Sequence, residues 1–311
     1  MTITQLEYIV AIDTYRHFAA AAGKCFVTQP TLSMQIQKLE DELNIKLFDR
    51  SKQPVVPTDI GSIVIQQARK ILHEVEVMHQ LINEQKGTVS GALRVGIIPT
   101  LAPYLLPLFL QQFLTNFPDV HIKVKEMTTE VILDDLKNGK IDVGLLVTPL
   151  EDPNIQEHPL FNEELVAYVS KKNLAYKKQY VLPQDIDIKE LWILEEGHCL
   201  RSQMINLCAL KKEQLQDSHF DYEAGSVETL RKMVEQNAGI TILPELATID
   251  FSAKQLQMVR HFKSPVPVRE VSLVTHRNYI KKKLVDALKT AITASLPAKI
   301  IANKNQKIIQ I

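Results

Sequence analysis

The stretch VTQPTLSMQIQKLEDEL at positions 27–43 decides the fold of the first part of this chain. Its apolar residues recur at spacings of four, three and four, which places them on one side of a helix: Leu32, Ile36, Leu39 and Leu43. Pro30 suits a first helical position, so we predict a helix from Thr31 to about Leu43. Two shorter helices, around 6–13 and over 18–24, precede it. Two helices joined by such a tight turn form the helix-turn-helix pattern.

The same region carries no acidic residue between Asp13 and Glu40, although the whole chain has 36 acidic and 36 basic residues. A surface cleared of acids is one that an anion can approach. The expected outer face of the third helix carries hydrogen-bonding side chains of a size that reads base edges: Gln29, Thr31, Ser33, Gln35 and Lys38. The segment 48–58 is typical of a two-stranded wing, with Arg50 and Lys52 placed to touch phosphate. The pattern alone leaves open a small helical domain that binds protein.

A long helix is predicted next, from a cap at Thr58 to about Gln85, before Gly87. Its apolar residues alternate spacings of four and three, a heptad seam: Val64, Ala68, Ile71, Val75, Met78 and Ile82. A helix packed only on its own domain normally shows a wider apolar stripe. The seam therefore favours a coiled coil between two copies of the chain.

Composition limits the class of protein. The chain has 311 residues, 45% of them hydrophobic, with 23% charged and a net charge of zero, so no global field attracts nucleic acid or a membrane. Three cysteines are too few for a disulfide scaffold and fit a reducing cytosol. The N-terminus lacks the features of a signal peptide, and no run approaches the roughly 18 apolar residues of a membrane span. We expect a cytoplasmic protein that does not enter a membrane.

From position 88 the pattern changes to alternating strands and helices. Strands are predicted at 92–98, 120–126 and 141–147, with helices at 101–117 and 129–137 between them. Such βαβ succession predicts a mostly parallel sheet that binds ligands at the carboxyl ends of its strands. Thr100 lies at such an end and is either a ligand-binding residue or a simple helix cap. A second cluster over 164–263 repeats the scheme, with strands at 192–194 and 240–243 and a helix at 226–236. A strand at 270–275 and a helix at 279–296 return to the first subdomain, so the cleft lies between two subdomains.

The segment GHCLRSQMINLC at 197–208 holds two of the three cysteines. It is predicted to be helical, and nine residues of helix rise about 13.5 Å and turn about 900°. A disulfide needs Cα atoms within about 7 Å, so Cys199 and Cys208 can pair only after the helix unwinds. A helix N-terminus, His198 and Arg201 are expected to lower the pKa of the Cys199 thiol. The segment is thus a candidate redox switch, and the alternative is two buried structural thiols.

The first 60 residues resemble the DNA-binding domain of LysR-type transcriptional regulators. The motifs are HFAAAA at 17–22, TQPTLSMQIQKLE at 28–40, LFDR at 47–50 and PTDIG at 57–61. The resemblance implies a winged helix-turn-helix domain at 1–58 with Gln29, Pro30, Thr31, Ser33 and Gln35 on the recognition helix. Thr28, just before that helix, is also expected to bind DNA. It further implies a dimerisation helix at 59–87 and an α/β, periplasmic-binding-protein-like regulatory domain at 88–311. In that domain subdomain I covers about 88–163 and 269–311, and subdomain II about 164–268. Cys25, before the recognition helix, is interpreted as a packed thiol.

Further motifs resemble the peroxide-sensing, or OxyR, branch of that family: IPT at 98–100, GHCLR at 197–201 with Cys208, ETLR at 228–231 and GIT at 239–241. The resemblance implies that Cys199 attacks hydrogen peroxide and Cys208 resolves the product as a disulfide. Thr100, Thr129, His198 and Arg269 are then expected to line the peroxide pocket. Ser202 departs from the branch, whose members usually carry Asp at that position, which puts the proton-transfer step in doubt.

The function implied is a DNA-binding regulator that senses hydrogen peroxide through a reversible disulfide and controls oxidative-stress genes, with no cofactor and no metal. Its expected partners are double-stranded operator DNA, a second chain in a homodimer that assembles to a homotetramer, RNA polymerase and a thiol reductant. The alternative is a LysR-type regulator that binds a small metabolite in the cleft while both thiols stay inert. A thiol peroxidase is a third reading, which the helix-turn-helix disfavours, so no enzyme is expected.

Overall fold

The structure is a computed structural model that describes residues 1–85, 89–208, 224–277, 279 and 282–302. The chain forms two compact units. The first runs from Met1 to Thr88, and the second covers nearly all of the chain from Val89 onwards.

The first unit begins with the predicted helix-turn-helix. Its elements are α1 (Ile3–Tyr15), α2 (Phe18–Lys24), α3 (Gln29–Leu43) and an antiparallel pair, β1 (Phe48–Asp49) with β2 (Val56–Pro57). Thr28 caps α3, because its hydroxyl accepts a hydrogen bond from the Thr31 amide. The predicted stripe on α3 faces the core, with Leu32, Ile36 and Leu39 fully buried.

The long helix α4 (Asp59–Gln85) starts where the sequence placed its cap, at Thr58, whose hydroxyl accepts a hydrogen bond from the Gly61 amide. A side chain at Gly61 would lie 2.0 Å from the Leu47 carbonyl oxygen, so only glycine fits there. The residues of the predicted heptad seam differ in burial between the first and the second half of α4. Ala68 is buried against the helix-turn-helix core, whereas Met78 and Ile82 are 56% and 53% exposed. The second half of α4 therefore keeps an apolar surface that this unit does not cover.

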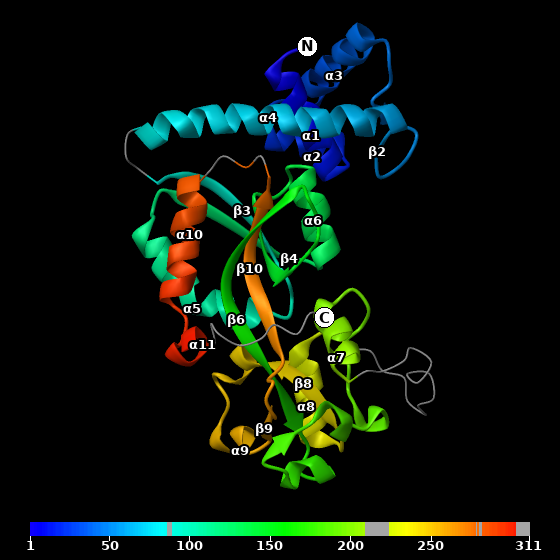
Figure 1. The fold of residues 1–311 in the computed structure, drawn as a ribbon. Coiled ribbons are helices and arrows are strands. Elements are labelled where there is room, and N and C mark those ends of the chain that lie inside the picture. The colour runs from blue at the N-terminus through cyan, green and yellow to red at the C-terminus, as the bar shows by residue number, and fades with distance from the viewer. Residues whose placement is uncertain (86–88, 209–223, 278, 280–281, 303–311) are drawn as a thin grey trace. The chain divides into compact units, whose positions relative to one another are not determined.

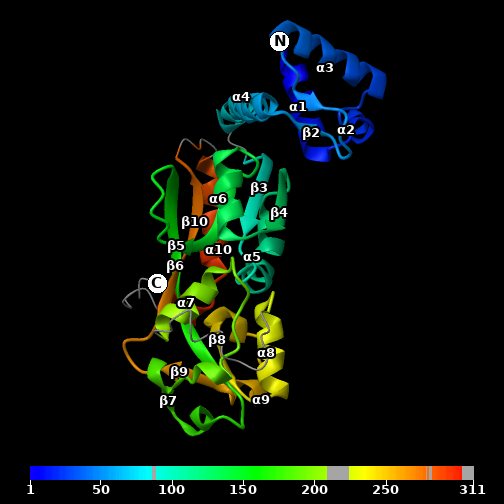
Figure 2. The ribbon, with the colours of Figure 1, turned by 90° about the vertical axis from the view of Figure 1, so that its right-hand side faces the viewer.

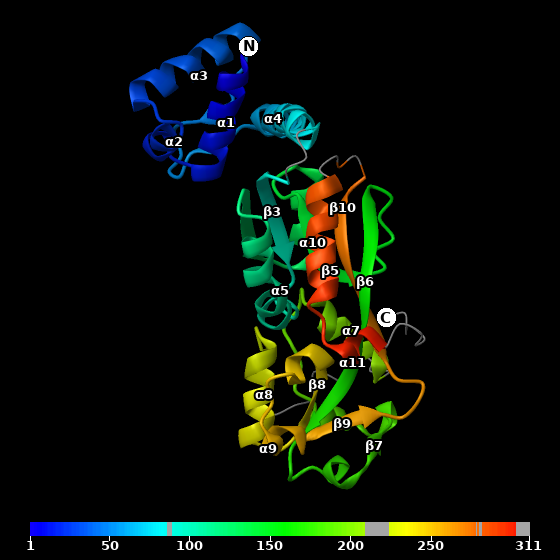
Figure 3. The ribbon, with the colours of Figure 1, turned by 90° about the vertical axis from the view of Figure 1, so that its left-hand side faces the viewer.

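The second unit contains two subdomains. Subdomain I is built on three parallel strands, with β3 (Gly91–Ile97) between β4 (Val120–Glu126) and β5 (Val143–Thr148). Helices α5 (Ala102–Asn116) and α10 (Lys282–Ala294) cover one face of this sheet. The other face is covered by α6 (Thr129–Lys137) (Figures 2 and 3).

Two long strands connect the subdomains. Strand β6 (Ile155–Val169) pairs antiparallel with β10 (Val268–His276), and its second half enters subdomain II to pair with β8 (Ile240–Pro244) and β9 (Val259–Phe262) (Figure 1). Subdomain II also contains β7 (Tyr180–Val181), α7 (Cys199–Leu207), α8 (Val227–Gln236) and α9 (Ala253–Leu256). The remaining elements are α11 (Ala298–Ala302) and the 3₁₀ turns η1 (Leu174–Lys177), η2 (Pro183–Asp185), η3 (Ile188–Glu190) and η5 (Glu245–Thr248).

Two expectations about this unit are wrong. The sheet is not mostly parallel, because β10 runs antiparallel to β5 and β6, and β6 runs antiparallel to β8 and β9. The segment 192–194 is not a strand, since only isolated bridges at Leu191 and Leu194 connect it to neighbouring backbone. The return of the chain to subdomain I through β10 and α10 is confirmed. None of the helices in the described part of the chain combines the length and apolar character that a bilayer crossing requires.

Candidate functional site

Two threonines lie at the same edge of the subdomain I sheet. Thr100 follows β3, and Thr129 is the first residue of α6 after β4. Because β3 and β4 are parallel neighbours, their carboxyl ends meet at one edge. The Thr100 side chain is buried there, and so is the hydroxyl oxygen of Thr129.

A buried ion pair completes this edge. Arg269 on β10 faces Glu163 on β6 as a cross-strand pair, with 2.7 Å between the guanidinium and the carboxylate and both side chains 0% exposed. The guanidinium donates to the Thr100 hydroxyl at 3.2 Å and to the Thr100 carbonyl at 3.3 Å. The other Glu163 oxygen accepts from the Leu246 amide at 2.8 Å. Burial raises the pKa of the Glu163 carboxyl, and the guanidinium opposes that rise.

Subdomain II brings a cysteine to the same place. Cys199 is the first residue of α7 and packs against the subdomain I core, whereas Leu200 and Met204 of the same helix are fully buried in the subdomain II core. Cys208 follows the last residue of α7 and packs against subdomain II. All three cysteines are free thiols. The prediction that an intact helix separates Cys199 from Cys208 is confirmed.

The electrostatic environment of Cys199 differs from the expectation. Burial raises the pKa of its thiol, and this effect exceeds the opposing influence of Arg269, the Leu200 amide and the Thr129 hydroxyl. The expectation that His198 and Arg201 lower the pKa of the Cys199 thiol was therefore wrong. Arg201 donates to the Leu194 carbonyl instead, and the cation that acts on the sulfur is Arg269, 70 positions away in sequence.

Among the described residues, the buried Gln203 side-chain oxygen has no hydrogen-bond partner, and the buried Thr129 hydroxyl has none besides the Cys199 thiol. Gln203 lies one helical turn after Cys199, and sequence reasoning missed it although the i, i+4 spacing was available. Unpaired buried polar atoms are costly unless a ligand or water satisfies them. The polar atoms beside the thiol therefore suit a small ligand that donates a hydrogen bond to Gln203 and exchanges one with the Thr129 hydroxyl.

The two other residues singled out beside Cys199 differ in burial. His198 precedes α7, is buried, and lies 3.7 Å from the Glu195 carboxylate. Ser202 is exposed, on the outer face of α7. Burial also raises the pKa of Cys208, to about 11, so at neutral pH this thiol is protonated. The described residues contain no group of three or more side chains that could hold a metal ion.

The second candidate surface lies on the first unit, at the start of α3. Thr28, Gln29, Pro30 and Thr31 are exposed there, and Lys38 is exposed further along the helix. Ser33 and Gln35 are only half-buried, and both have neighbours: Ser33 accepts from Arg50, and the Gln35 amide oxygen accepts from Gln5. The exposed set is suited to the polar edges of bases in a groove.

The two basic wing residues differ in their freedom. Lys52 is 66% exposed, with a carboxylate of Asp49 3.9 Å away. The Arg50 guanidinium is held by contacts within the domain, because it lies 3.3 Å from the buried Glu40 carboxylate and 5.0 Å from the centre of the Phe18 ring. Glu40 also accepts from the Leu47 amide at 2.8 Å, so it fixes the wing to α3. Sequence reasoning treated Glu40 only as the end of an acid-free stretch.

Comparison with known proteins identifies the class. Residues 3–62 match the bacterial regulatory helix-turn-helix model of the lysR family, and residues 86–297 match the LysR substrate binding domain. The chain belongs to the LysR family of transcriptional regulators, so the first unit is a DNA-binding domain. Within that family its relatives include OxyR proteins and hydrogen peroxide-inducible genes activators.

Two relatives illustrate the similarity. The hydrogen peroxide-inducible genes activator of Haemophilus influenzae is 38% identical over 274 residues, which cover 88% of this chain and 90% of that protein. The dual regulator OxyR of Escherichia coli K12 is 36% identical over 296 residues, 95% of this chain and 96% of that protein.

Solved structures agree with this. Full-length OxyR from Pseudomonas aeruginosa with a cysteine-to-aspartate substitution matches with a TM-score of 0.77 at 31% identity, covering 94% of this chain and 98% of that one. A hydrogen peroxide-bound cysteine-to-serine mutant of OxyR from Corynebacterium glutamicum matches with a TM-score of 0.64 at 26% identity, covering 99% and 97%.

Proposed function

We propose that this protein is a cytoplasmic transcriptional regulator that senses hydrogen peroxide and changes its binding to operator DNA through a reversible Cys199–Cys208 disulfide. One observation carries the proposal: the two thiols lie at opposite ends of one helix, and the first of them shares its helix with the buried, unpaired Gln203 side-chain oxygen and interacts with the Thr129 hydroxyl. One relative is a hydrogen peroxide-inducible genes activator, and one similar OxyR structure is hydrogen peroxide-bound, which supports the choice of oxidant.

The first chemical step takes place at Cys199. Its sulfur attacks one oxygen of the peroxide, the O–O bond breaks, and the leaving hydroxide combines with the thiol proton as water. Cys199 is left as a sulfenic acid. Thr129 and Thr100 hydrogen-bond the peroxide, and the Arg269 guanidinium stabilises the negative charge that develops on sulfur and on the leaving oxygen. His198 and Gln203 complete the polar lining.

The second step couples oxidation to shape. The Cys208 thiol attacks the Cys199 sulfenic sulfur, a disulfide forms, and water leaves. Nine helical residues hold the two apart by about 13.5 Å, about twice the Cα separation that a disulfide allows. The segment must therefore leave its helix and withdraw Leu200 and Met204 from the subdomain II core. Closing a ten-residue loop is worth about 2.7 kcal/mol, which offsets part of that loss.

The DNA-binding residues follow from the exposed face of α3 and the wing. Gln29, Thr31 and Lys38 reach base edges or phosphates, with Thr28 and Pro30 setting the start of the helix. Lys52 contacts phosphate, while Arg50 and Gln35 act partly through the contacts they make within the domain. The exposed apolar half of α4 pairs two chains into a homodimer, and dimers assemble to a homotetramer that contacts RNA polymerase.

A dithiol reductant returns the disulfide to two thiols with two electrons and two protons. The chain consumes one peroxide for each such cycle, so we expect a switch and not an enzyme with sustained peroxide turnover. A metabolite-responsive regulator with inert thiols is the alternative.

The experiment compares DNA binding of three proteins before and after a brief peroxide pulse. Wild type is expected to shift its operator footprint and to lose two free thiols in the peptide that contains Cys199 and Cys208. Cys199→Ser is expected to do neither. Cys25→Ser, which removes the third thiol, is the matched control and should behave as wild type. An unchanged peroxide response in Cys199→Ser would refute the proposal and favour the metabolite-responsive alternative.

A further inference from the structure

Two large apolar side chains are exposed on the DNA-binding unit, beside the polar residues at the start of α3. Phe26 lies in the turn between α2 and α3 and is 95% exposed, and Met34 lies on α3 and is 62% exposed. Side chains that stay in water contribute little hydrophobic stabilisation when the domain folds. Both are therefore available to a partner, and their surroundings decide which partner fits.

The backbone at Phe26 is unusual for an aromatic residue. Its φ is +56°, in the left-handed region that glycine adopts freely and bulky residues rarely do. The Val27 amide donates to the Ala22 carbonyl at 3.1 Å, and the Phe26 amide donates to the Gly23 carbonyl at 3.3 Å. These two hydrogen bonds form a Schellman motif, in which glycine is the usual residue at the place of Phe26. An aromatic residue here strains the backbone and gains no burial, so folding does not account for it.

Met34 belongs to the face of α3 that the domain core leaves uncovered. It follows Pro30 by four positions and precedes Lys38 by four, a spacing that places these residues on one face of the helix. All three are exposed, whereas Leu32 and Ile36, on the core side of α3, are fully buried. Met34 therefore lies among the side chains proposed above to contact DNA.

The charge around Phe26 and Met34 selects DNA as their partner. Both lie within the stretch 14–39, which contains no acidic residue, and basic residues are spread along it: Arg16, Lys24 and Lys38. A polyanion can approach such a surface without repulsion. In the major groove every A·T pair presents one apolar group, the 5-methyl of thymine, and apolar side chains contact it.

We propose that Phe26 and Met34 read thymine in the operator, each by packing against a 5-methyl group in the major groove. The inference rests on the DNA-binding surface of α3 proposed above and adds an apolar component to its hydrogen-bonding residues. It also gives the strained, exposed ring of Phe26 a role in binding. Burial of one methyl group is worth about fourfold in affinity, the equivalent of about 0.8 kcal/mol.

The test removes single methyl groups from the DNA. Reduced full-length protein first selects a binding duplex from a random pool, and deoxyuridine then replaces each thymidine of that duplex in turn. Uracil keeps the hydrogen-bonding edge of thymine and lacks only the methyl. We expect replacement of a contacted thymidine to weaken wild-type binding about fourfold in fluorescence anisotropy at a fixed salt concentration. Binding that no replacement weakens would overturn the proposal.

Variants assign the contacts to the two side chains. Phe26→Ala and Met34→Ala should each lose the preference for thymidine at the position that the missing side chain contacts, while Met34→Leu, which stays apolar, should keep it. Phe26→Gly should lose the same preference as Phe26→Ala and yet unfold at no lower urea concentration than wild type, because glycine relieves the strained backbone. A side chain that served only the fold would not separate binding from stability in this way.

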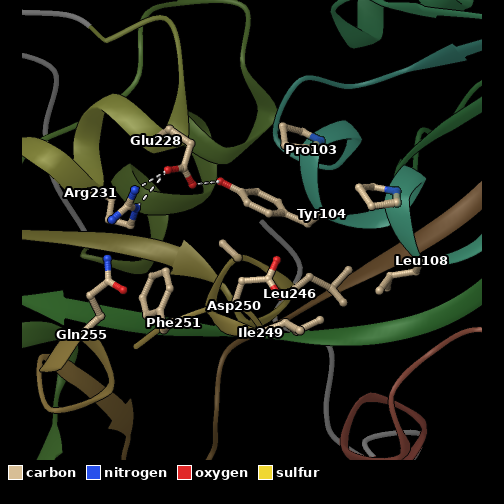
Figure 4. Close-up of a pocket in the computed structure, with 12 residues that line it drawn as sticks. Pro103, Tyr104, Leu108, Glu228, Arg231, Leu246, Ile249, Asp250, Phe251 and Gln255 are labelled. Carbon is tan, nitrogen blue, oxygen red and sulfur yellow. Dashed lines mark hydrogen bonds and ion pairs between the residues drawn. The ribbon is translucent and has the colours of Figure 1, made fainter. Parts of the chain in front are cut away.

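Ile249→Ala is the control. Ile249 is an apolar residue of the second unit, 43% exposed, and lines a pocket there (Figure 4). Its truncation should leave the thymidine preference as in wild type. The proposal fails if the preference survives in Phe26→Ala and Met34→Ala, or if these variants bind the thymidine and deoxyuridine duplexes more weakly by an equal factor. A wild-type protein that selects no duplex would refute the proposed operator binding itself, whereas binding indifferent to the methyl groups refutes this inference alone.

Discussion

Met204→Ala should make the disulfide form of this regulator easier to reach. Met204 lies on α7 between the two cysteines and is fully buried in the subdomain II core of the reduced protein. Truncating a buried methionine to alanine costs about 2–5 kcal/mol. If α7 must unwind before Cys199 meets Cys208, the oxidised form has already given up this contact and the cost falls mainly on the reduced form.

The expected size of the effect follows from that difference. We take about 2–3 kcal/mol as the part of the truncation cost that destabilises only the reduced form. Since 1.4 kcal/mol corresponds to about 30 mV in a two-electron couple, the reduction potential becomes more negative by about 40–60 mV. The assay equilibrates the protein in a series of dithiol redox buffers, alkylates the free thiols and measures the oxidised fraction by mass spectrometry.

Met258→Ala is the matched control. Met258 has the same side chain and belongs to the same core, but it lies outside α7. Its truncation should lower the melting temperature of both redox forms and leave the potential where it is in wild type. A potential for Met204→Ala equal to that of wild type, or less negative, would refute the claim that the helix must come apart.

Three further predictions follow from single contacts. Glu40→Gln should destabilise the first unit by about 1–3 kcal/mol in urea unfolding, because a buried charged acceptor of the Leu47 amide is lost. Glu42→Gln, at an exposed site, is the control, and an equal loss of stability in the two variants would contradict the role of Glu40. The raised pKa of Cys208 means that folding disfavours its thiolate, so the free energy of unfolding of the reduced protein should fall as pH rises from about 8.5 towards 11. Cys208→Ser should remove that part of the pH dependence. Identical pH curves for wild type and Cys208→Ser would contradict the prediction. Thr129→Val should slow sulfenic acid formation about tenfold in stopped-flow measurements with no change in melting temperature, and a wild-type rate would remove Thr129 from the pocket.

Local sequence patterns predicted the local elements well. The bounds of α2, β4 and α6 agree with the structure, because apolar spacing and capping residues act over a few positions. The separation of the two cysteines by a helix also followed from spacing alone. Of the parallel strands of subdomain I, β3 and β5 are mostly apolar runs, whereas β4 alternates apolar and polar residues.

Features that depend on distant parts of the chain were not predicted. Glu163 and Arg269 are 106 positions apart, and no sequence pattern shows that they form one buried pair. The raised pKa of Cys199 has the same origin, since burial by subdomain I outweighs the helix terminus. The first half of β6 is rich in polar residues and is a strand because β10 pairs with it, not because of its own apolar pattern.

Amide hydrogen exchange over 199–208, in reduced protein and after stoichiometric peroxide, tests the central claim most directly. In the reduced form the later amides of α7 are hydrogen-bonded within the helix and should be protected. Oxidation should remove that protection in wild type, leave it intact in Cys208→Ser, and change the α8 amides far less. A peptide that carries the disulfide and keeps the protection of the reduced form would contradict the account.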